Sequence, residues 1–161
     1  MRLAMSLIYI AAIGILAHFI GEALPRRWFC ADRAPFKPFK WEKNGRIYLK
    51  IGVHRWKDKL PDMSRVLPDR VRKSISLTDG SAAAERVTHE TCVAETVHWA
   101  LLLLSGGIRL IYPTLLGWII TIVYALSHIP FIIIQRYNRP TLNQLAKRLK
   151  EREERKSKCT C

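Results

Sequence analysis

The residues best suited to chemistry are Glu95 and His98, which lie three positions apart in a stretch that runs directly into Ala100 and four leucines. At this spacing the two side chains are neighbours on one face of a helix. An ionisable group in hydrocarbon costs about 2.5–3.5 kcal/mol on insertion scales, so such groups are rarely retained without a task. The pair predicts proton transfer, with His98 as a general base and Glu95 as the partner that orients it.

Three long apolar segments must position this pair. Because a helix needs about 20 mostly apolar residues to cross a bilayer, they predict an all-α integral membrane protein with about three transmembrane helices. We expect a single membrane domain over residues 1–161, with spans at about 3–24, 86–105 and 109–134. The glycines of Ser105-Gly106-Gly107 predict the turn between the second and third spans, and Pro130 a kink in the third. The alternative is two spans, with the second segment only dipping into the membrane.

Charge gives the expected orientation. The net charge is +14, and 25 of the 27 Lys and Arg residues lie in residues 26–90 and 135–161. Positively charged loops next to spans stay on the cytosolic side. We therefore expect a multi-pass protein of the cell membrane, with its N-terminus outside, its C-terminus cytosolic and anionic lipids as partners.

The basic region 26–85 mixes cations with aromatic side chains. Such a mixture also occurs on surfaces that bind single-stranded nucleic acid. Beside membrane spans it fits the headgroup layer better, so we expect no nucleic acid and instead short interfacial helices on the cytosolic side, separated by prolines. An amphipathic helix is expected at 140–156, capped by Asn138 and lying flat on the same surface.

Counting helical rise from the membrane boundary places Glu95 at a depth of about 7 Å and His98 at about 12 Å. His18 and His128 come out at about 10 Å, so histidines from three spans share one level. A metal site is therefore an alternative to general-base chemistry, because Glu-x-x-His pairs also occur in carboxylate metal sites. For His18 and His128 taken singly, an ordinary packing or hydrogen-bonding role is the favoured interpretation.

Several motifs occur in a characteristic order: Trp41-Glu42-Lys43-Asn44-Gly45, Trp56-Lys57-Asp58-Lys59, Glu90-Thr91 through Glu95 to His98-Trp99, and Gln135-Arg136-Tyr137-Asn138-Arg139-Pro140. From about residue 20 to residue 155 the chain resembles the glycosyl-4,4′-diaponeurosporenoate acyltransferase family of Gram-positive bacteria. The resemblance implies an acyltransferase that moves a fatty acyl chain onto a sugar hydroxyl of a glycosylated C30 carotenoid, the last step of staphyloxanthin-type carotenoid biosynthesis. A related glycolipid is the alternative acceptor.

The resemblance also implies site residues. Matching the motifs one by one adds substrate- or donor-binding candidates to Glu95 and His98, namely Glu42, Trp56, Lys57, Glu90, Asn138 and Arg139. We expect Arg136, Arg139 and Lys57 to hold the donor phosphate or the developing oxyanion. The donor is expected to be acyl-CoA or another acyl donor, with no further cofactor and no metal, since His18 and His128 lie outside the family pattern. The rival hypotheses are a non-catalytic lipid-binding scaffold and a metal-dependent membrane enzyme.

Overall fold

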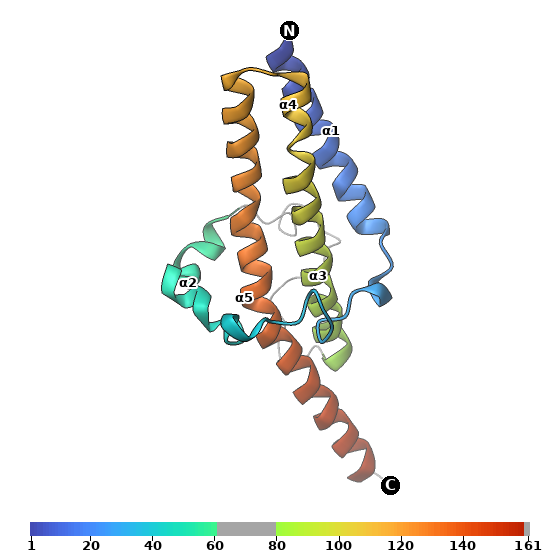
Figure 1. Ribbon diagram of the computed structural model, residues 1–161. Coiled ribbons are helices and arrows are strands. Elements are labelled where there is room, and N and C mark those ends of the chain that lie inside the picture. The colour runs from blue at the N-terminus through green and yellow to red at the C-terminus, as the bar shows by residue number, and fades with distance from the viewer. Residues whose placement is uncertain (61–79, 160–161) are drawn as a thin grey trace. The chain divides into compact units, whose positions relative to one another are not determined.

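A computed structural model describes residues 1–60 and 80–159 of the chain. Its α-helices and short 3₁₀ helices follow one another with no strand in the described ranges (Figure 1). The bounds are α1 (Arg2–Ala23), η1 (Arg26–Trp28), η2 (Lys40–Glu42), η3 (Arg46–Ile51), α2 (Val53–Trp56), η4 (Lys57–Lys59), α3 (Gly80–Leu104), α4 (Gly107–Ile111) and α5 (Leu115–Cys159). The part of the predicted basic region at residues 61–79 lies outside the described residues.

Three helical stretches are long and apolar enough to cross a membrane: Arg2–Ala23, Gly80–Ile111 and Leu115–Lys158. At a rise of about 1.5 Å per residue, the 22 residues of α1 extend over about 33 Å. The hydrocarbon core of a bilayer is about 30 Å thick, so α1 has the required length. The prediction of an all-α integral membrane protein with three spans is confirmed.

The chain divides into two compact units. The membrane unit comprises Met1–Pro25 and Val93–Ile133, and the basic unit comprises Arg26–Cys92 and Ile134–Cys161. Helices α3 and α5 contribute residues to both units. The expected single domain, with spans ending at 24, 105 and 134, stays a prediction.

The core of the membrane unit joins α1 to α3. Ile13 and Ala17 of α1 bury against Leu101 of α3, and partly buried Tyr9, Val97 and Tyr124 pack around them. Small residues allow the two helices to approach closely, as is usual for membrane helices. A Cβ atom added to Gly21 of α1 would lie only 2.9 Å from the Val97 side chain. Figure 1 shows α1 running alongside the upper half of α3.

The turn between the second and third spans differs from the prediction. Helix α3 ends at Leu104, a short turn at Ser105 and Gly106 leads into α4, and the helical path ends at Tyr112, whose backbone is not helical. The break lies at Tyr112–Thr114 because Pro113 disfavours helical geometry in the residue before it. Gly107 instead serves packing, because a Cβ there would overlap the Tyr9 hydroxyl.

Helix α5 also differs from the expected pair of helices. It continues without a break from Leu115 to Cys159, through Pro130, Asn138 and Pro140, so residues 140–156 form its last turns rather than a separately capped helix. In the basic unit, Ala146 and Leu149 of this stretch bury against Ala84 of α3. The apolar stripe predicted to lie on the membrane therefore packs against protein. An amphipathic pattern alone does not distinguish these two environments.

Candidate active site

The membrane unit contains a pair of histidines in contact. Nδ1 of His98 on α3 lies 3.2 Å from Nδ1 of His128 on α5, a hydrogen-bond distance. The ring centroids are 5.4 Å apart and the planes are tilted by 42°. Because the contact joins two different helices, it places both imidazoles in a fixed relation to each other.

Aromatic rings enclose the pair. Phe131 stacks on His98 with the centroids 4.7 Å apart, and Tyr124 meets the His128 ring edge-on at the same separation. His128 is 7% exposed. Its Nε2 atom is buried and has no hydrogen-bond partner among the described residues. A buried polar atom without a partner is unusual in a native structure, so this one needs an explanation.

Glu95 lies one turn before His98 on α3, as predicted, and is 2% exposed. The indole Nε1 of Trp99 donates to Glu95 Oε1 over 3.4 Å. His18, the third histidine of the predicted level, makes an edge contact with Phe19, its neighbour in α1. No three His, Cys, Asp or Glu side chains within residues 1–60 and 80–159 are grouped so that they could hold a metal ion.

In the basic unit, Glu42 is held by its own chain. It is 1% exposed, and Nε and one terminal nitrogen of Arg136 donate to its two oxygens over 2.6 and 2.8 Å. The Tyr48 hydroxyl and the backbone N–H of Phe39 donate to the same carboxylate. Burial raises the pKa of Glu42, but the hydrogen bonds from Arg136, Tyr48 and Phe39 outweigh it and leave the pKa below the ordinary value. The carboxylate therefore stays ionised.

The turn after Glu42 explains the Trp-Glu-Lys-Asn-Gly motif. Lys43, Asn44 and Gly45 all have positive φ, with values of 49°, 55° and 84°. A Cβ on Gly45 would lie 3.0 Å from the backbone oxygen of Tyr137. Glycine is favoured here by both the left-handed backbone and the close approach of α5. The motif thus fits the loop against the helix within the basic unit.

Arg139 is the most deeply buried cation in the described part of the chain, at 1% exposed. Nε donates to Thr91 Oγ1, and the terminal nitrogens donate to the backbone oxygens of Thr91 and Phe36, each over 2.9 Å. The guanidinium also lies over the Phe36 ring, 5.4 Å from its centroid. One side chain thus joins α5, α3 and the loop that contains Phe36.

The remaining predicted residues also lie in the basic unit. Arg26 forms a salt bridge to Glu90 over 2.8 Å. Lys57 Nζ lies 5.5 Å from the centroid of the Tyr137 ring, and Trp56 Nε1 donates to the Ile51 backbone oxygen. Asn138 is partly buried on α5. The structure thus connects Glu42 with Arg136, whereas His98 and Glu95 belong to the membrane unit.

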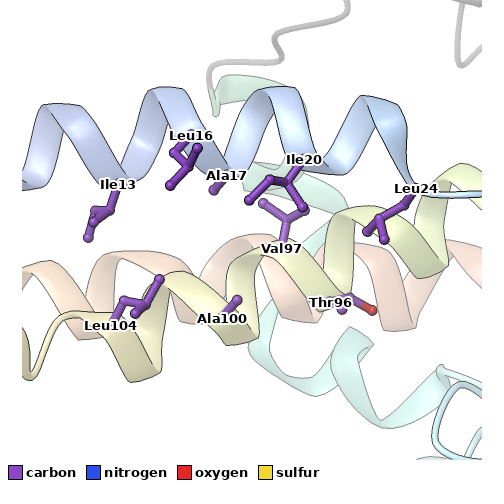
Figure 2. A pocket seen from close by; sticks show the side chains of 9 residues that line it. All are labelled: Ile13, Leu16, Ala17, Ile20, Leu24, Thr96, Val97, Ala100 and Leu104. Atoms are coloured by element: carbon purple, nitrogen blue, oxygen red, sulfur yellow. The ribbon is translucent and has the colours of Figure 1, made fainter.

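An apolar groove lies between α1 and α3 of the membrane unit (Figure 2). Its volume is about 150 Å³, and its lining residues are Ile13, Leu16, Ala17, Ile20, Leu24, Thr96, Val97, Ala100 and Leu104. This lining suits hydrocarbon. At 100° per residue, the α3 positions that line the groove lie away from His98 on the helix. The groove and the histidine pair are therefore separate features of the unit.

The sequence does not predict two kinds of residue that form part of these sites. Tyr124 and Phe131 resemble ordinary apolar residues of a span, and only their positions, four residues before and three residues after His128, point to a role. Tyr48 and Phe36 lie in an irregular region without periodicity. Helical rise places His128 at about the depth of His98, but nothing in the sequence shows that their nitrogens meet.

Comparison with known proteins gives the family. The profile of the family described as glycosyl-4,4′-diaponeurosporenoate acyltransferase matches residues 25–148. The protein of that name from Staphylococcus aureus strain bovine RF122 / ET3-1 is 34% identical over 142 residues, which cover 84% of this chain and 82% of the relative. The one from strain N315 is 33% identical with the same coverage. No solved structure matches the chain. The chain therefore belongs to the glycosyl-4,4′-diaponeurosporenoate acyltransferase family and is an acyltransferase.

Proposed function

We propose that this acyltransferase moves a fatty acyl chain from an activated donor onto a sugar hydroxyl of a glycosylated C30 carotenoid in the membrane. The acceptor is proposed from the name of the Staphylococcus aureus relatives. The observation that carries the chemistry is the partly buried imidazole pair on helices long and apolar enough to span a bilayer. Such a site suits an acceptor that is itself a lipid.

In the proposed reaction His98 is the general base. The oxygen of the sugar hydroxyl attacks the acyl carbonyl carbon, and the hydroxyl proton passes to a nitrogen of His98. Collapse of the tetrahedral intermediate forms the ester and expels the leaving group of the donor, a thiolate in the case of acyl-CoA. The leaving group takes the proton from His98, which restores the base. Glu95, one turn before His98 on the same helix, is the proposed partner that orients the ring.

We assign the donor to the basic unit. Acyl-CoA carries phosphates. The chain has a net charge of +14, and its positive charge is concentrated in two basic blocks, residues 26–90 and 135–161. Lys57 is the proposed phosphate contact, aided by Trp56 and Asn138. The segments that carry the donor-binding residues are held by two contacts, Arg136 with Glu42 and Arg139 with Thr91. The salt bridge between Glu90 and Arg26 adds a third contact within the unit. No further cofactor is required by this reaction.

The same charge distribution supports the proposed orientation, with the N-terminus outside, the C-terminus cytosolic and anionic lipids next to the basic blocks. The test is a reporter enzyme fused to either terminus, of a type that is active only in the cytosol. Activity of the C-terminal fusion alone is expected. Activity of the N-terminal fusion alone would reverse the orientation.

The function is tested with membranes that contain the protein, glycosyl-4,4′-diaponeurosporenoate and radiolabelled palmitoyl-CoA. A labelled, less polar carotenoid ester is expected, and mild alkali should release the label as fatty acid. Membranes with the His98→Gln variant are the matched control. Unlabelled carotenoid with an active relative in parallel would contradict the proposal. The scaffold hypothesis predicts no product, and the metal-enzyme hypothesis predicts product that disappears after chelation.

A further inference from the structure

We propose that His128 is the positioning residue of this reaction: it accepts a hydrogen bond from Nδ1–H of His98 and so fixes Nε2 of His98 as the base. This inference rests on the proposed function, which needs a base at His98. It goes beyond the family motifs, because His128 is not part of them. The observations that carry it are the Nδ1 to Nδ1 distance of 3.2 Å and the buried Nε2 of His128.

The distance restricts where the protons sit. A neutral imidazole has one N–H donor and one bare nitrogen. Two Nδ1 atoms at hydrogen-bond distance therefore need one protonated and one bare nitrogen, so the two rings must be opposite tautomers. When His98 donates, its Nε2 is bare and able to take a proton. In that state His128 presents its bare Nδ1 to His98 and carries its own proton on Nε2.

The same contact stabilises His98 when it is protonated during the reaction. When Nε2 of His98 takes the hydroxyl proton, both nitrogens of His98 become donors, and Nδ1–H gains a charge-assisted bond to His128. When the leaving group takes that proton back, the neutral pair returns to its starting tautomers. His128 gains and loses no covalent bond, so it acts through His98 and does not touch the substrate.

The surroundings of His128 favour this role over simple packing. The ring is 7% exposed, and the edge of Tyr124 lies against it. If the position of His128 served packing alone, a leucine or phenylalanine would fill it. Neither residue would bury an unpaired polar atom, as His128 does with Nε2. Phe131 stacks on the His98 ring and limits its rotation. The alternative is that His128 only joins two membrane helices by a polar contact.

Kinetics of the full-length protein in membranes separate these roles. Three variants are compared with the wild type: His128→Leu removes the acceptor, His128→Asn keeps an acceptor oxygen near the position of Nδ1, and Ser127→Ala changes the exposed neighbour. We expect His128→Leu to lower kcat by about 10²-fold with KM nearly unchanged. His128→Asn should stay within about tenfold of the wild type, and Ser127→Ala should match it.

The tautomer of His98 gives a readout that a packing role would not move. Nitrogen NMR of ¹⁵N-histidine-labelled protein distinguishes protonated from bare ring nitrogens, and the His98→Gln spectrum identifies the signals of His98. In the wild type we expect a protonated Nδ1 and a bare Nε2. In His128→Leu we expect the reverse, because Nε2–H is the commoner tautomer of a histidine without an Nδ1 acceptor.

Two results would overturn the inference. One is wild-type kcat in His128→Leu. The other is a low kcat in both His128 variants with the His98 tautomer unchanged, which would leave His128 with a packing role alone. Failure of the proposed base gives a different result from these two, since the His98→Gln variant would then transfer acyl chains at the wild-type rate.

Discussion

The two units bury polar side chains in different ways. In the basic unit, the carboxylate of Glu42 accepts from Arg136, Tyr48 and the backbone of Phe39, and three nitrogens of Arg139 donate to protein oxygens. In the membrane unit, the rings of His98 and His128 meet at their Nδ1 atoms, and Nε2 of His128 has no partner among the described residues.

This difference separates structural from chemical roles. Each hydrogen bond of a buried charge offsets part of its desolvation cost, so a well-satisfied cluster stabilises one conformation. The contact between two imidazole rings contributes less to stability, and in the proposed tautomer it keeps Nε2 of His98 available as a proton acceptor. The comparison predicts that substitutions of the buried charges Glu42 and Arg139 mainly change stability, whereas substitutions of the histidine pair mainly change turnover.

The largest stability effect is expected for Arg139→Ala. The change leaves the backbone oxygens of Thr91 and Phe36 and the Thr91 hydroxyl without their donor, at a cost of about 3–5 kcal/mol in the free energy of unfolding. Arg139→Lys is the matched control: it keeps the charge but not the planar fork, so it should recover only part of the loss. Thermal unfolding in detergent, followed by circular dichroism, measures both. An Arg139→Ala protein as stable as the wild type would contradict this account.

A somewhat smaller effect is expected for Glu42→Gln. The substitution leaves the nearly buried guanidinium of Arg136 without its counter-charge, which costs about 2–4 kcal/mol. Tyr48→Phe removes only one of the donors to Glu42 and should cost about 1–2 kcal/mol. The same unfolding experiment ranks the two. A larger loss in Tyr48→Phe than in Glu42→Gln would be inconsistent with the ion pair as the main contact.

Acid should weaken the basic unit through Glu42. Its pKa in the folded protein lies below the ordinary carboxyl value of 4.5. The stabilisation is therefore complete above about pH 4.5 and is lost as the pH falls through the lower folded value. Unfolding midpoints measured from pH 6 downward should fall more steeply in the wild type than in Glu42→Gln. Parallel curves would show that other carboxyl groups dominate.

The smallest effect is expected at the surface of the basic unit. Asp32 accepts from Lys147 and Asn143 over 2.8 Å, but Asp32 and Lys147 are 55% and 57% exposed. The hydrogen bond from Lys147 keeps the pKa of Asp32 below its ordinary value, against the opposing effect of partial burial. Asp32→Asn should cost less than about 1 kcal/mol, and less still in high salt. A loss comparable with that of Arg139→Ala would break the distinction between buried and exposed pairs.

The sequence predicts the helical architecture well and its turns less well. The length and composition of the apolar segments identify all three candidate spans, because the bilayer imposes a length that can be counted. A short turn does occur at Ser105–Gly106, but the break before α5 lies at Tyr112–Thr114. Glycine is tolerated inside membrane helices, where it permits close packing, whereas Pro113 restricts the preceding backbone.

The sequence predicts which residues of the site are unusual, but it does not predict their contact partners. The spacing of Glu95 and His98 on one helix follows from the sequence, whereas the contact of His98 with His128, 30 positions away, depends on how α3 and α5 pack. The same holds for Arg139, 48 positions from Thr91. Long-range partners of this kind require tertiary structure, which residue type and periodicity do not contain.

The most direct test measures turnover and stability on the same sample of the His98→Gln protein, purified and reconstituted in vesicles. With glycosyl-4,4′-diaponeurosporenoate and palmitoyl-CoA, we expect the rate of ester formation to fall by about 10²–10⁴-fold while the unfolding midpoint stays close to that of the wild type. Ester formation at the wild-type rate would contradict the account, because the imidazole of His98 would then have no part in the chemistry.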